Sequence, residues 1–200
     1  MLVLFDNGTP RTLARYLKGR NSFPCPNEVV EIDAKSATVA RRWSTLQCKQ
    51  PVSMALDTTH HRLFSGCRSG VMAVSDYQAG KLVTTLPIGA GVDGAGYDAA
   101  SGHAFASNAD GTLTVIHQDT PDTYHVVQNV QTPQSARNMG LDPTNHRVFI
   151  VSAKFGPAPA GGIITCWSQE RVRAILPRSW VSVRRSLSCS NASAIRRAYP

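Results

Sequence analysis

Histidines and cysteines are the residues of this chain best suited to metal or redox chemistry. The histidines stand at positions 60, 61, 103, 117, 125 and 146. His61, His103 and His146 occupy corresponding places in a repeated unit, just before a strand, so we expect them to lie one repeat apart rather than around one ion. The remaining pair to consider, His117 and His125, has no acid or cysteine at ligand spacing. The sequence therefore predicts no metal site and no cofactor.

The five cysteines show no metal-binding Cys-x-x-Cys spacing. Cys48 and Cys67 flank a predicted hairpin with arms at residues 51–57 and 62–67, which would bring position 67 opposite position 51 and close to Cys48. A disulfide between them is sterically reasonable if the protein reaches an oxidising compartment. The pairing of Cys48 with Cys67 stays a hypothesis at this point, with two free thiols as its alternative.

Candidates for ligand binding are polar residues at repeat positions near the expected channel mouth. They are Arg68, Asp93, Asn108, Asp110 and Arg137. Asp93 and Arg137 stand where the first repeat has Val52, so they would place opposite charges at a ligand entrance. Ordinary solvated loop charges are the alternative interpretation. No Gly-x-Ser-x-Gly elbow is present, and we assign no catalytic residue.

A repeated unit must position these residues. Its copies lie at residues 56–64, 97–105 and 141–149, and their aspartates, Asp57, Asp98 and Asp142, are separated by 41 and 44 residues. Short apolar runs at this period are typical of β-propeller blades of four strands each. The sequence predicts an all-β fold: antiparallel four-stranded blades of a partial β-propeller with about three blades, and irregular basic N- and C-terminal segments.

Three further aspartates, Asp33, Asp76 and Asp119, recur every 43 residues where the first strand of each repeat ends. Aspartate at the head of a turn accepts hydrogen bonds from backbone N–H groups two or three residues on. We expect all three to serve the structure in this way.

The domain organisation follows from where the repeats stop. We expect a frayed or loosely docked basic arm and linker at 1–26, with a short helix over 10–18 as its alternative. Blades follow at 27–68, 69–109 and 110–162, and then an Arg/Ser-rich tail at 163–200 that is disordered or loosely packed. The net charge of +8 sits in the two ends, and the repeats are close to neutral. Nucleic-acid binding is therefore not favoured.

The repeats resemble the YVTN family of β-propellers, and within it the bacterial YncE-like subgroup, over about residues 27–160. The resemblance is carried by Phe105-Ala106-Ser107-Asn108 and by the stretches 29–33, 60–68 and 108–115. It implies a ring of seven blades and a periplasmic or secreted location. Three blades are too few to close such a ring, so we expect an open arc, with end faces that favour self-association, from a fragment or frame-disrupted relative of a complete propeller.

The predicted function is a non-enzymatic binding or interaction module with a WD-like repeat architecture. Its partner is an unknown small molecule or protein at the channel mouth. The alternatives are a lactonase-type propeller hydrolase and a non-functional truncated remnant. No apolar run is long enough to span a membrane as a helix, and the run Met1 to Phe5 is too short for the core of a signal peptide.

Overall fold

The computed structural model describes residues 2–6, 9–11, 27–152, 168–170, 175–176 and 179–181, with side chains over 27–152. Its strands are β1 (Leu2–Asp6), β2 (Thr9–Arg11), β3 (Glu28–Asp33), β4 (Val39–Ser44), β5 (Pro51–Asp57), β6 (Arg62–Cys67), β7 (Val71–Asp76), β8 (Lys81–Pro87), β9 (Val92–Asp98), β10 (His103–Asn108), β11 (Thr112–Thr120), β12 (Thr123–Gln131), β13 (Asn138–Asp142), β14 (Arg147–Ser152), β15 (Ser168–Glu170), β16 (Ile175–Leu176) and β17 (Ser179–Val181). Within these ranges no helix is long and apolar enough to cross a bilayer.

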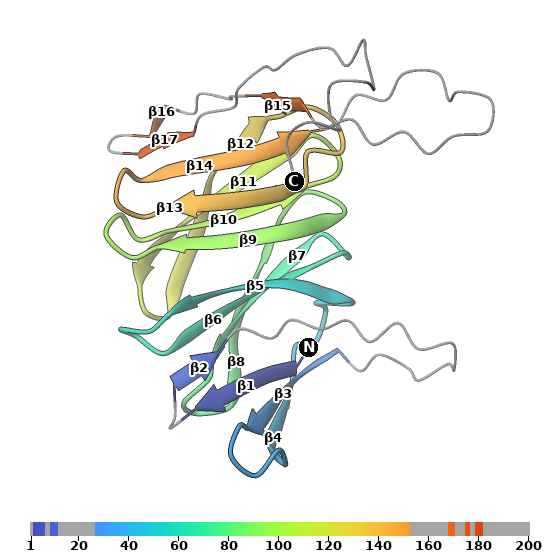
Figure 1. Cartoon of the computed structure of the whole chain (residues 1–200), viewed down its shortest axis with the longest axis vertical. Helices are drawn as coiled ribbons and strands as arrows, with labels where there is room; N and C mark the ends of the chain where they lie inside the picture. Colours follow the sequence, from blue (N-terminus) through green and yellow to red (C-terminus); the bar gives the residue numbers. More distant parts are fainter. Residues whose placement is uncertain are drawn as a thin grey trace, which may run out of the picture.

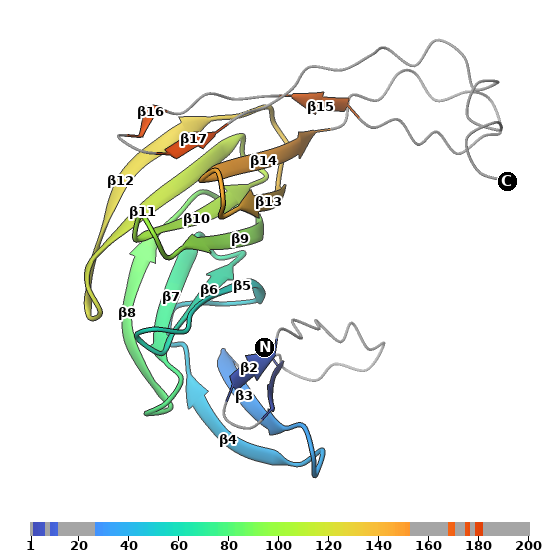
Figure 2. The same cartoon turned by 60° about the vertical axis from the view of Figure 1, so that its left-hand side comes forward.

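Two four-stranded antiparallel sheets form the centre of the molecule, with strand orders β5-β6-β7-β8 and β9-β10-β11-β12. The sheets stack in sequence order (Figure 1), and β5, β9 and β13 lie on the concave side of the resulting arc while β4, β8 and β12 lie on the convex side (Figure 2). This is the arrangement of propeller blades around an axis. The all-β prediction of four-stranded antiparallel blades is confirmed.

The sheets are out of phase with the sequence repeats. Strands β5 and β6 close the first repeat, yet they pair with β7 and β8, which open the second. The expected blade boundaries at 68/69 and 109/110 therefore fall inside sheets, in the β6–β7 and β10–β11 turns. Because each complete sheet draws strands from two repeats, every repeat is hydrogen-bonded into the next.

The terminal sheets contain strands in segments for which none was predicted. In the first, of order β2-β1-β3-β4, β1 runs parallel to β3 and antiparallel to β2. Pro10 and Arg11 belong to β2, and the rest of the helix predicted up to Lys18 lies outside the described residues. In the last sheet β14 pairs with β13, β15 and β17. Most of the tail predicted to be disordered also lies outside the described residues.

Aromatic packing joins the two central sheets. The fully buried ring of Phe64 on β6 stacks on Tyr97 with 4.9 Å between centroids and meets Tyr124 edge-on at 5.8 Å. Burying a phenylalanine side chain contributes roughly 1.5–3 kcal/mol, and a favourable aromatic pair adds about 1 kcal/mol. Phe64, the first copy of the phenylalanine that recurs in the repeat unit, is therefore an anchor between these two sheets.

The turn after each inner strand corrects the alignment of the histidines. His61, Gly102 and His146 all adopt a left-handed backbone, with φ of 58°, 67° and 52°. These three residues are structurally equivalent, and His103 is one position further on, inside β10. The prediction that His103 corresponds to His61 was wrong by one residue. In a strand, such a shift moves a side chain to the opposite face.

Candidate functional site

Three of the predicted ligand-binding residues meet at one end of the inner strands. Asp93 lies 3.6 Å from the guanidinium of Arg68 through Oδ1 and 3.5 Å from that of Arg137 through Oδ2. The three residues come from three successive sheets. We call this group the Arg–Asp–Arg cluster.

Strand ends and turns hold the Arg–Asp–Arg cluster in place. Arg68 opens the β6–β7 turn, where its N–H donates to the Gln50 carbonyl at 3.1 Å. Asp93 is the second residue of β9, and Arg137 directly precedes β13. The hydroxyl of Ser107 donates to the Arg137 carbonyl. The inner strands of neighbouring blades lie close to one another around the propeller axis. Arg68 and Arg137, about 25 residues before and about 44 residues after Asp93, can therefore both reach its carboxylate.

The cluster carries an excess of positive charge. One carboxylate sits between two guanidinium groups, at distances longer than those of tight charge-assisted hydrogen bonds. The side chains of Arg68 and Arg137 are 47% and 46% exposed, and that of Asp93 is 28% exposed. Guanidinium N–H groups at such a place can accept a second anionic partner in the planar, two-point manner typical of arginine.

Asn108 and Asp110, also predicted as ligand-binding residues, have structural contacts instead. Asn108 is fully buried, and its amide donates to the Ala106 carbonyl and to the hydroxyls of Thr112 and Thr114 at 3.1–3.2 Å. Asp110 accepts from the Ala90 N–H at 2.6 Å and from Thr112 at 2.7 and 3.1 Å. Asp110 fastens the loop before β9 to the β10–β11 turn, and Asn108 ties β10 to β11. Neither residue joins the Arg–Asp–Arg cluster.

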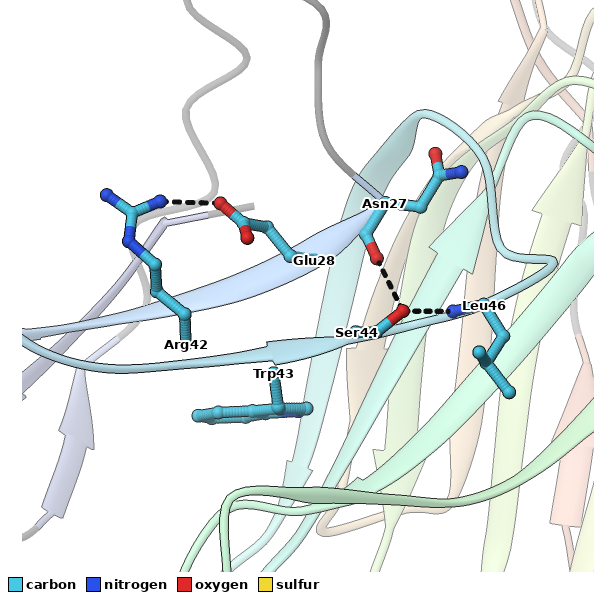
Figure 3. Close-up of a pocket in the computed structure, with 6 residues that line it drawn as sticks. All are labelled: Asn27, Glu28, Arg42, Trp43, Ser44 and Leu46. Atoms are coloured by element: carbon cyan, nitrogen blue, oxygen red, sulfur yellow. Dashed lines mark hydrogen bonds and ion pairs between the residues drawn. The ribbon is translucent and has the colours of Figure 1, made fainter.

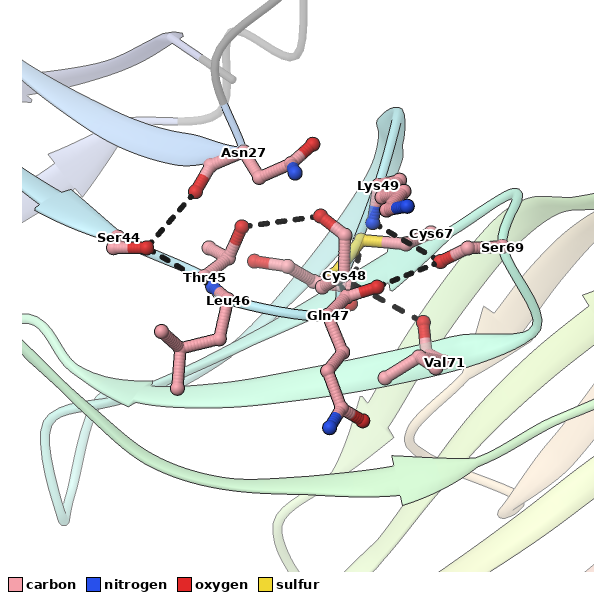
Figure 4. The surroundings of a disulfide bond; sticks show 11 residues. Asn27, Ser44, Thr45, Leu46, Gln47, Cys48, Lys49, Cys67, Ser69 and Val71 are labelled. Atoms are coloured by element: carbon pink, nitrogen blue, oxygen red, sulfur yellow. Dashed lines mark hydrogen bonds between the residues drawn. A yellow bond between two sulfur atoms is a disulfide. The ribbon is translucent and has the colours of Figure 1, made fainter.

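Cys48 and Cys67 are joined by a disulfide, with their Cα atoms 5.3 Å apart (Figure 4). Both are fully buried, and Ala73 and the partly buried Val71 and Leu82 pack around them. The bond ties the loop after β4 to the end of β6, and therefore joins the first sheet to the second. It is enclosed by the protein and offers no exposed sulfur for chemistry.

A shallow hollow that sequence reasoning missed lies on the first sheet (Figure 3). It has a volume of about 500 Å³ and is lined by Asn27, Glu28, Arg42, Trp43, Ser44 and Leu46. Arg42 and Glu28 form an ion pair at 2.5 Å, so the charges of this pair neutralise each other. The hollow therefore has less to attract a charged ligand than the Arg–Asp–Arg cluster.

Asp119 does not head a turn. Asp33 accepts from the N–H groups of Lys35 and Ser36 as predicted, whereas Asp119 lies inside β11, which continues to Thr120. Its carboxylate accepts from Nδ1 of His117 at 2.8 Å and Nδ1 of His125 at 2.7 Å. The prediction that no acid accompanies these two histidines was therefore wrong.

The end of the strands remote from the Arg–Asp–Arg cluster holds a buried polar network around Asp57. Burial by itself raises the pKa of the Asp57 carboxyl, but hydrogen bonds from His60 and Gln118 outweigh it, so the pKa lies below its usual value. Tyr97 donates to Gln118 at 2.5 Å and to Asp57 at 3.4 Å. Burial, followed by the charge of Asp57, raises the pKa of Tyr97. This network joins β5 to β9 and β11.

Comparison with known proteins supports the fold and no particular activity. No protein-family model and no curated protein matches the sequence. Among solved structures, the chain is similar to Kuenenia stuttgartiensis hydrazine synthase, with 16% identity and a TM-score of 0.57 over 66% of this chain and 37% of the other. Saccharomyces cerevisiae Sqt1 matches 53% of this chain and 29% of its own, with 14% identity and a TM-score of 0.47.

The chain thus spans well under half the length of the solved structures that it matches. Hydrazine synthase contains a β-propeller. At such low identity the likeness to hydrazine synthase concerns the fold alone. Together with the stacked four-stranded sheets, it shows that this chain is a β-propeller module.

Proposed function

We propose that this chain is a binding module that recognises an anionic group, a carboxylate or a phosphate, through the Arg–Asp–Arg cluster. The observation that carries the proposal is the meeting of Arg68, Asp93 and Arg137 from three successive sheets. Two half-exposed guanidinium groups share the carboxylate of Asp93, and among the described residues no second carboxylate forms an ion pair with either arginine. Arginine pairs are well suited to carboxylate and phosphate oxygens because their N–H groups form a planar fork.

The position of the cluster supports a role in binding. Ligands of ring-shaped and layered folds are commonly held where the ends of several strands meet, because groups from different elements converge there. Asp93 orients both guanidinium groups in the absence of a ligand. An incoming anion would compete with Asp93 for the same N–H donors, which makes the cluster responsive to the charge of its partner.

The finer family assignment belongs to the same proposal. The strand that ends in Phe105-Ala106-Ser107-Asn108 and the recurring aspartate-headed turns favour a YVTN-type, YncE-like propeller. In a complete ring of this kind, further blades would add their own turns around the same opening. The Cys48–Cys67 disulfide favours an oxidising compartment, since such bonds are rare in the reducing cytosol.

Calorimetric titration with inorganic phosphate and with citrate tests this function. We expect binding of at least one probe that weakens about tenfold with each of Arg68→Gln and Arg137→Gln, because each substitution removes a charge-assisted contact. Arg42→Gln is the matched control: Arg42 is also an exposed arginine paired with a carboxylate, but it lies outside the cluster.

Asp93→Asn separates this proposal from a purely structural role. Removing the competing carboxylate should strengthen binding of phosphate or citrate, because the two guanidinium groups are then left for the ligand. Loss of binding in Asp93→Asn, or equal binding by wild type and the Arg68→Gln, Arg137→Gln double variant, would reject the proposal.

A further inference from the structure

A row of three histidines crosses the sheet β9–β12 at the end remote from the Arg–Asp–Arg cluster. His103 on β10 is the register partner of His117 on β11, and His117 is in turn the register partner of His125 on β12. Register partners on neighbouring strands project from the same face of a sheet. The rings are accordingly close: centroids of His103 and His117 are 4.9 Å apart, and those of His117 and His125 are 5.6 Å apart.

Asp119 adds a carboxylate to this face. It follows His117 by two residues on β11, at a register irregularity between Gln118 and Thr120, and its carboxylate contacts the rings of His117 and His125. Its two oxygens are divided between the two rings, with Oδ1 2.8 Å from Nδ1 of His117 and Oδ2 2.7 Å from Nδ1 of His125. Ligand-type atoms of His117, Asp119 and His125 all lie within 4.8 Å of one another.

The neighbouring sheet, β5–β8, has no such row of histidines. There the corresponding row consists of Arg62, Asp76 and Lys81, and Arg62 pairs with Asp76 at 3.1 Å. Asp76 also accepts from the N–H of Ala79, as a turn residue does. In the sheet β9–β12, the corresponding cation and acid are both replaced by histidine. Asp98, the register partner of His103, accepts hydrogen bonds from its own turn and from His146. Asp119 is held by the imidazole nitrogens of His117 and His125.

We propose that His117, Asp119 and His125 form a binding site for a late first-row divalent metal ion such as Zn²⁺. Two imidazoles and one carboxylate are a donor set that zinc and its neighbours bind readily, with water completing the coordination. Around a tetrahedral zinc, ligand atoms about 2.0–2.1 Å from the ion lie roughly 3.3 Å from one another. Small rotations of three partly exposed side chains bring the present separations to that value.

Metal binding at this site needs no redox step. Each Nδ1 now donates a hydrogen to Asp119; in the bound form that hydrogen moves to Nε2 by way of solvent, and the freed Nδ1 lone pair coordinates the ion. The carboxylate oxygens exchange two hydrogen bonds for coordination to the metal. The ion then links β11 to β12 beside their tight turn, as a clip for the outer hairpin.

His103 is not a ligand in this proposal. It lies on the far side of His117 from Asp119's second partner, and its Nδ1 is buried without a hydrogen-bond partner. Its ring packs against His117 and limits where the His117 ring can turn. It acts as a positioning residue.

Calorimetric titration of the full chain with Zn²⁺ tests the site, after alkylation of thiols outside the Cys48–Cys67 disulfide. We expect one site that Mg²⁺ does not occupy, because magnesium prefers oxygen ligands. His125→Asn and Asp119→Asn should each weaken Zn²⁺ binding at this site at least about tenfold. Removing a residue that only supports a metal ligand already lowers metal affinity by about this factor.

His60→Asn is the matched control. His60 is also partly exposed and lies 2.7 Å from a carboxylate, that of Asp57, but no second histidine shares that carboxylate. Zinc binding should be unchanged in His60→Asn. Equal zinc affinity in wild type, His125→Asn and Asp119→Asn would overturn the proposal.

A measurement on the wild type guards against variants that fail to fold. In a long-range ¹H–¹⁵N spectrum, Zn²⁺ should shift the imidazole nitrogens of His117 and His125 and leave those of His60 unchanged. Equal shifts of all histidines would show non-selective surface binding and would also overturn the proposal. Neither result depends on the binding of anions by the Arg–Asp–Arg cluster, so the two proposals fail separately.

Discussion

The two complete sheets, β5–β8 and β9–β12, share one backbone plan with an offset of 41 residues. The residue before the inner strand is left-handed in both, Gln50 with φ 54° and Gly91 with φ 70°. The glycine at the end of the β6–β7 turn, Gly70 with φ 77°, and the one at the end of the β10–β11 turn, Gly111 with φ 87°, are left-handed as well. Because the backbone is the same, differences between the sheets come from their side chains.

At the end near the Arg–Asp–Arg cluster, the two sheets differ in how the loop before the inner strand is packed against the end of the second strand. In β5–β8 the two are joined by the disulfide from Cys48 to Cys67. In β9–β12 the corresponding residues are Gly89 and Asn108, and the Asn108 amide fills the space above the glycine. A covalent bond and a buried amide thus occupy equivalent positions.

At the end remote from the Arg–Asp–Arg cluster, the sheet β5–β8 has a row of ion-paired residues where the sheet β9–β12 has a row of histidines. Arg62 donates to the Pro121 carbonyl at 2.8 Å and pairs with Asp76 and Asp122, so it also reaches the β11–β12 turn of the next sheet. Among the ring contacts described, His103, the residue corresponding to Arg62, meets only His117 and Phe105, both in its own sheet. One row joins two sheets, while the other gathers donors on one face.

The largest effect should come from breaking the covalent bond. Cys48→Ser combined with Cys67→Ser should lower the free energy of unfolding by about 3 kcal/mol, because the bond closes a loop with a sequence separation of 19 residues. Urea unfolding followed by circular dichroism measures the difference.

Intact mass with and without reductant is the control, since reduction of one disulfide must add two hydrogens. Asn108→Ser, at the corresponding position of the other sheet, should cost less because it leaves the chain topology unchanged. Equal losses in the two sheets would contradict the distinction between a covalent and a polar closure.

The next largest effect should separate the two rows. Arg62→Leu should destabilise the protein by about 2–3 kcal/mol, because it strips a nearly buried guanidinium from Asp76 and from the Pro121 carbonyl. His103→Leu at the corresponding position should cost under about 1 kcal/mol, since it replaces a half-buried ring by a side chain of similar volume. Thermal unfolding of the two variants side by side checks this order, and the reverse order would show that the histidine row carries the sheet.

The sequence predicts the fold well because a propeller repeat leaves a periodic signal in short apolar runs and polar turns. It does not predict which strands share a sheet, since the repeat has the same period wherever its boundary is drawn. It predicted Arg68, Asp93 and Arg137 as candidates from their positions, but their meeting at one carboxylate depends on how three sheets converge.

The errors come from register. Asp119 was aligned with Asp76 by a spacing of 43 residues, whereas the sheets repeat at 41, so the residue that corresponds to Asp76 is His117. With the same offset of 41 residues, Asn108, predicted as a ligand-binding residue, corresponds to the buried Cys67. Aligning the glycines at 70 and 111 would have revealed both, because each marks the same left-handed turn.

A smaller effect is expected where the second sheet has a glycine in place of a cysteine. A Cβ on Gly89 would meet the hydroxyl oxygen of Thr112 first, and would lie 2.6 Å from Nδ2 of Asn108 and 2.7 Å from Oδ2 of Asp110. Gly89→Ala should therefore destabilise the protein by about 1–2 kcal/mol through overpacking. In the Asn108→Ser background the same change should cost less, because one of the three side chains that the Cβ would meet is shortened. If the two substitutions lowered the free energy of unfolding additively in a double-mutant cycle, the prediction that Gly89 and Asn108 are packed against each other would be wrong.

The smallest effect should appear at alkaline pH, at the boundary between the two sheets. Burial raises the pKa of Tyr97 and of Tyr124, both of which pack on Phe64. An unfolded tyrosine loses its proton near pH 10, whereas these folded ones keep theirs. Above that pH the unfolded state binds fewer protons than the folded state, so the free energy of unfolding should fall as pH rises and should be unaffected by these groups well below it.

Tyr97→Phe tests this assignment, because it keeps the ring against Phe64 and removes the hydroxyl that titrates. Between about pH 8 and pH 10.5 the variant should lose less stability than the wild type in urea unfolding, and Tyr124 should account for part of the dependence that remains. Parallel pH profiles for the two proteins would show that the Tyr97 hydroxyl is not held protonated at the boundary. In that case the network from Asp57 to Gln118, rather than burial between the sheets, would set the behaviour of this interface.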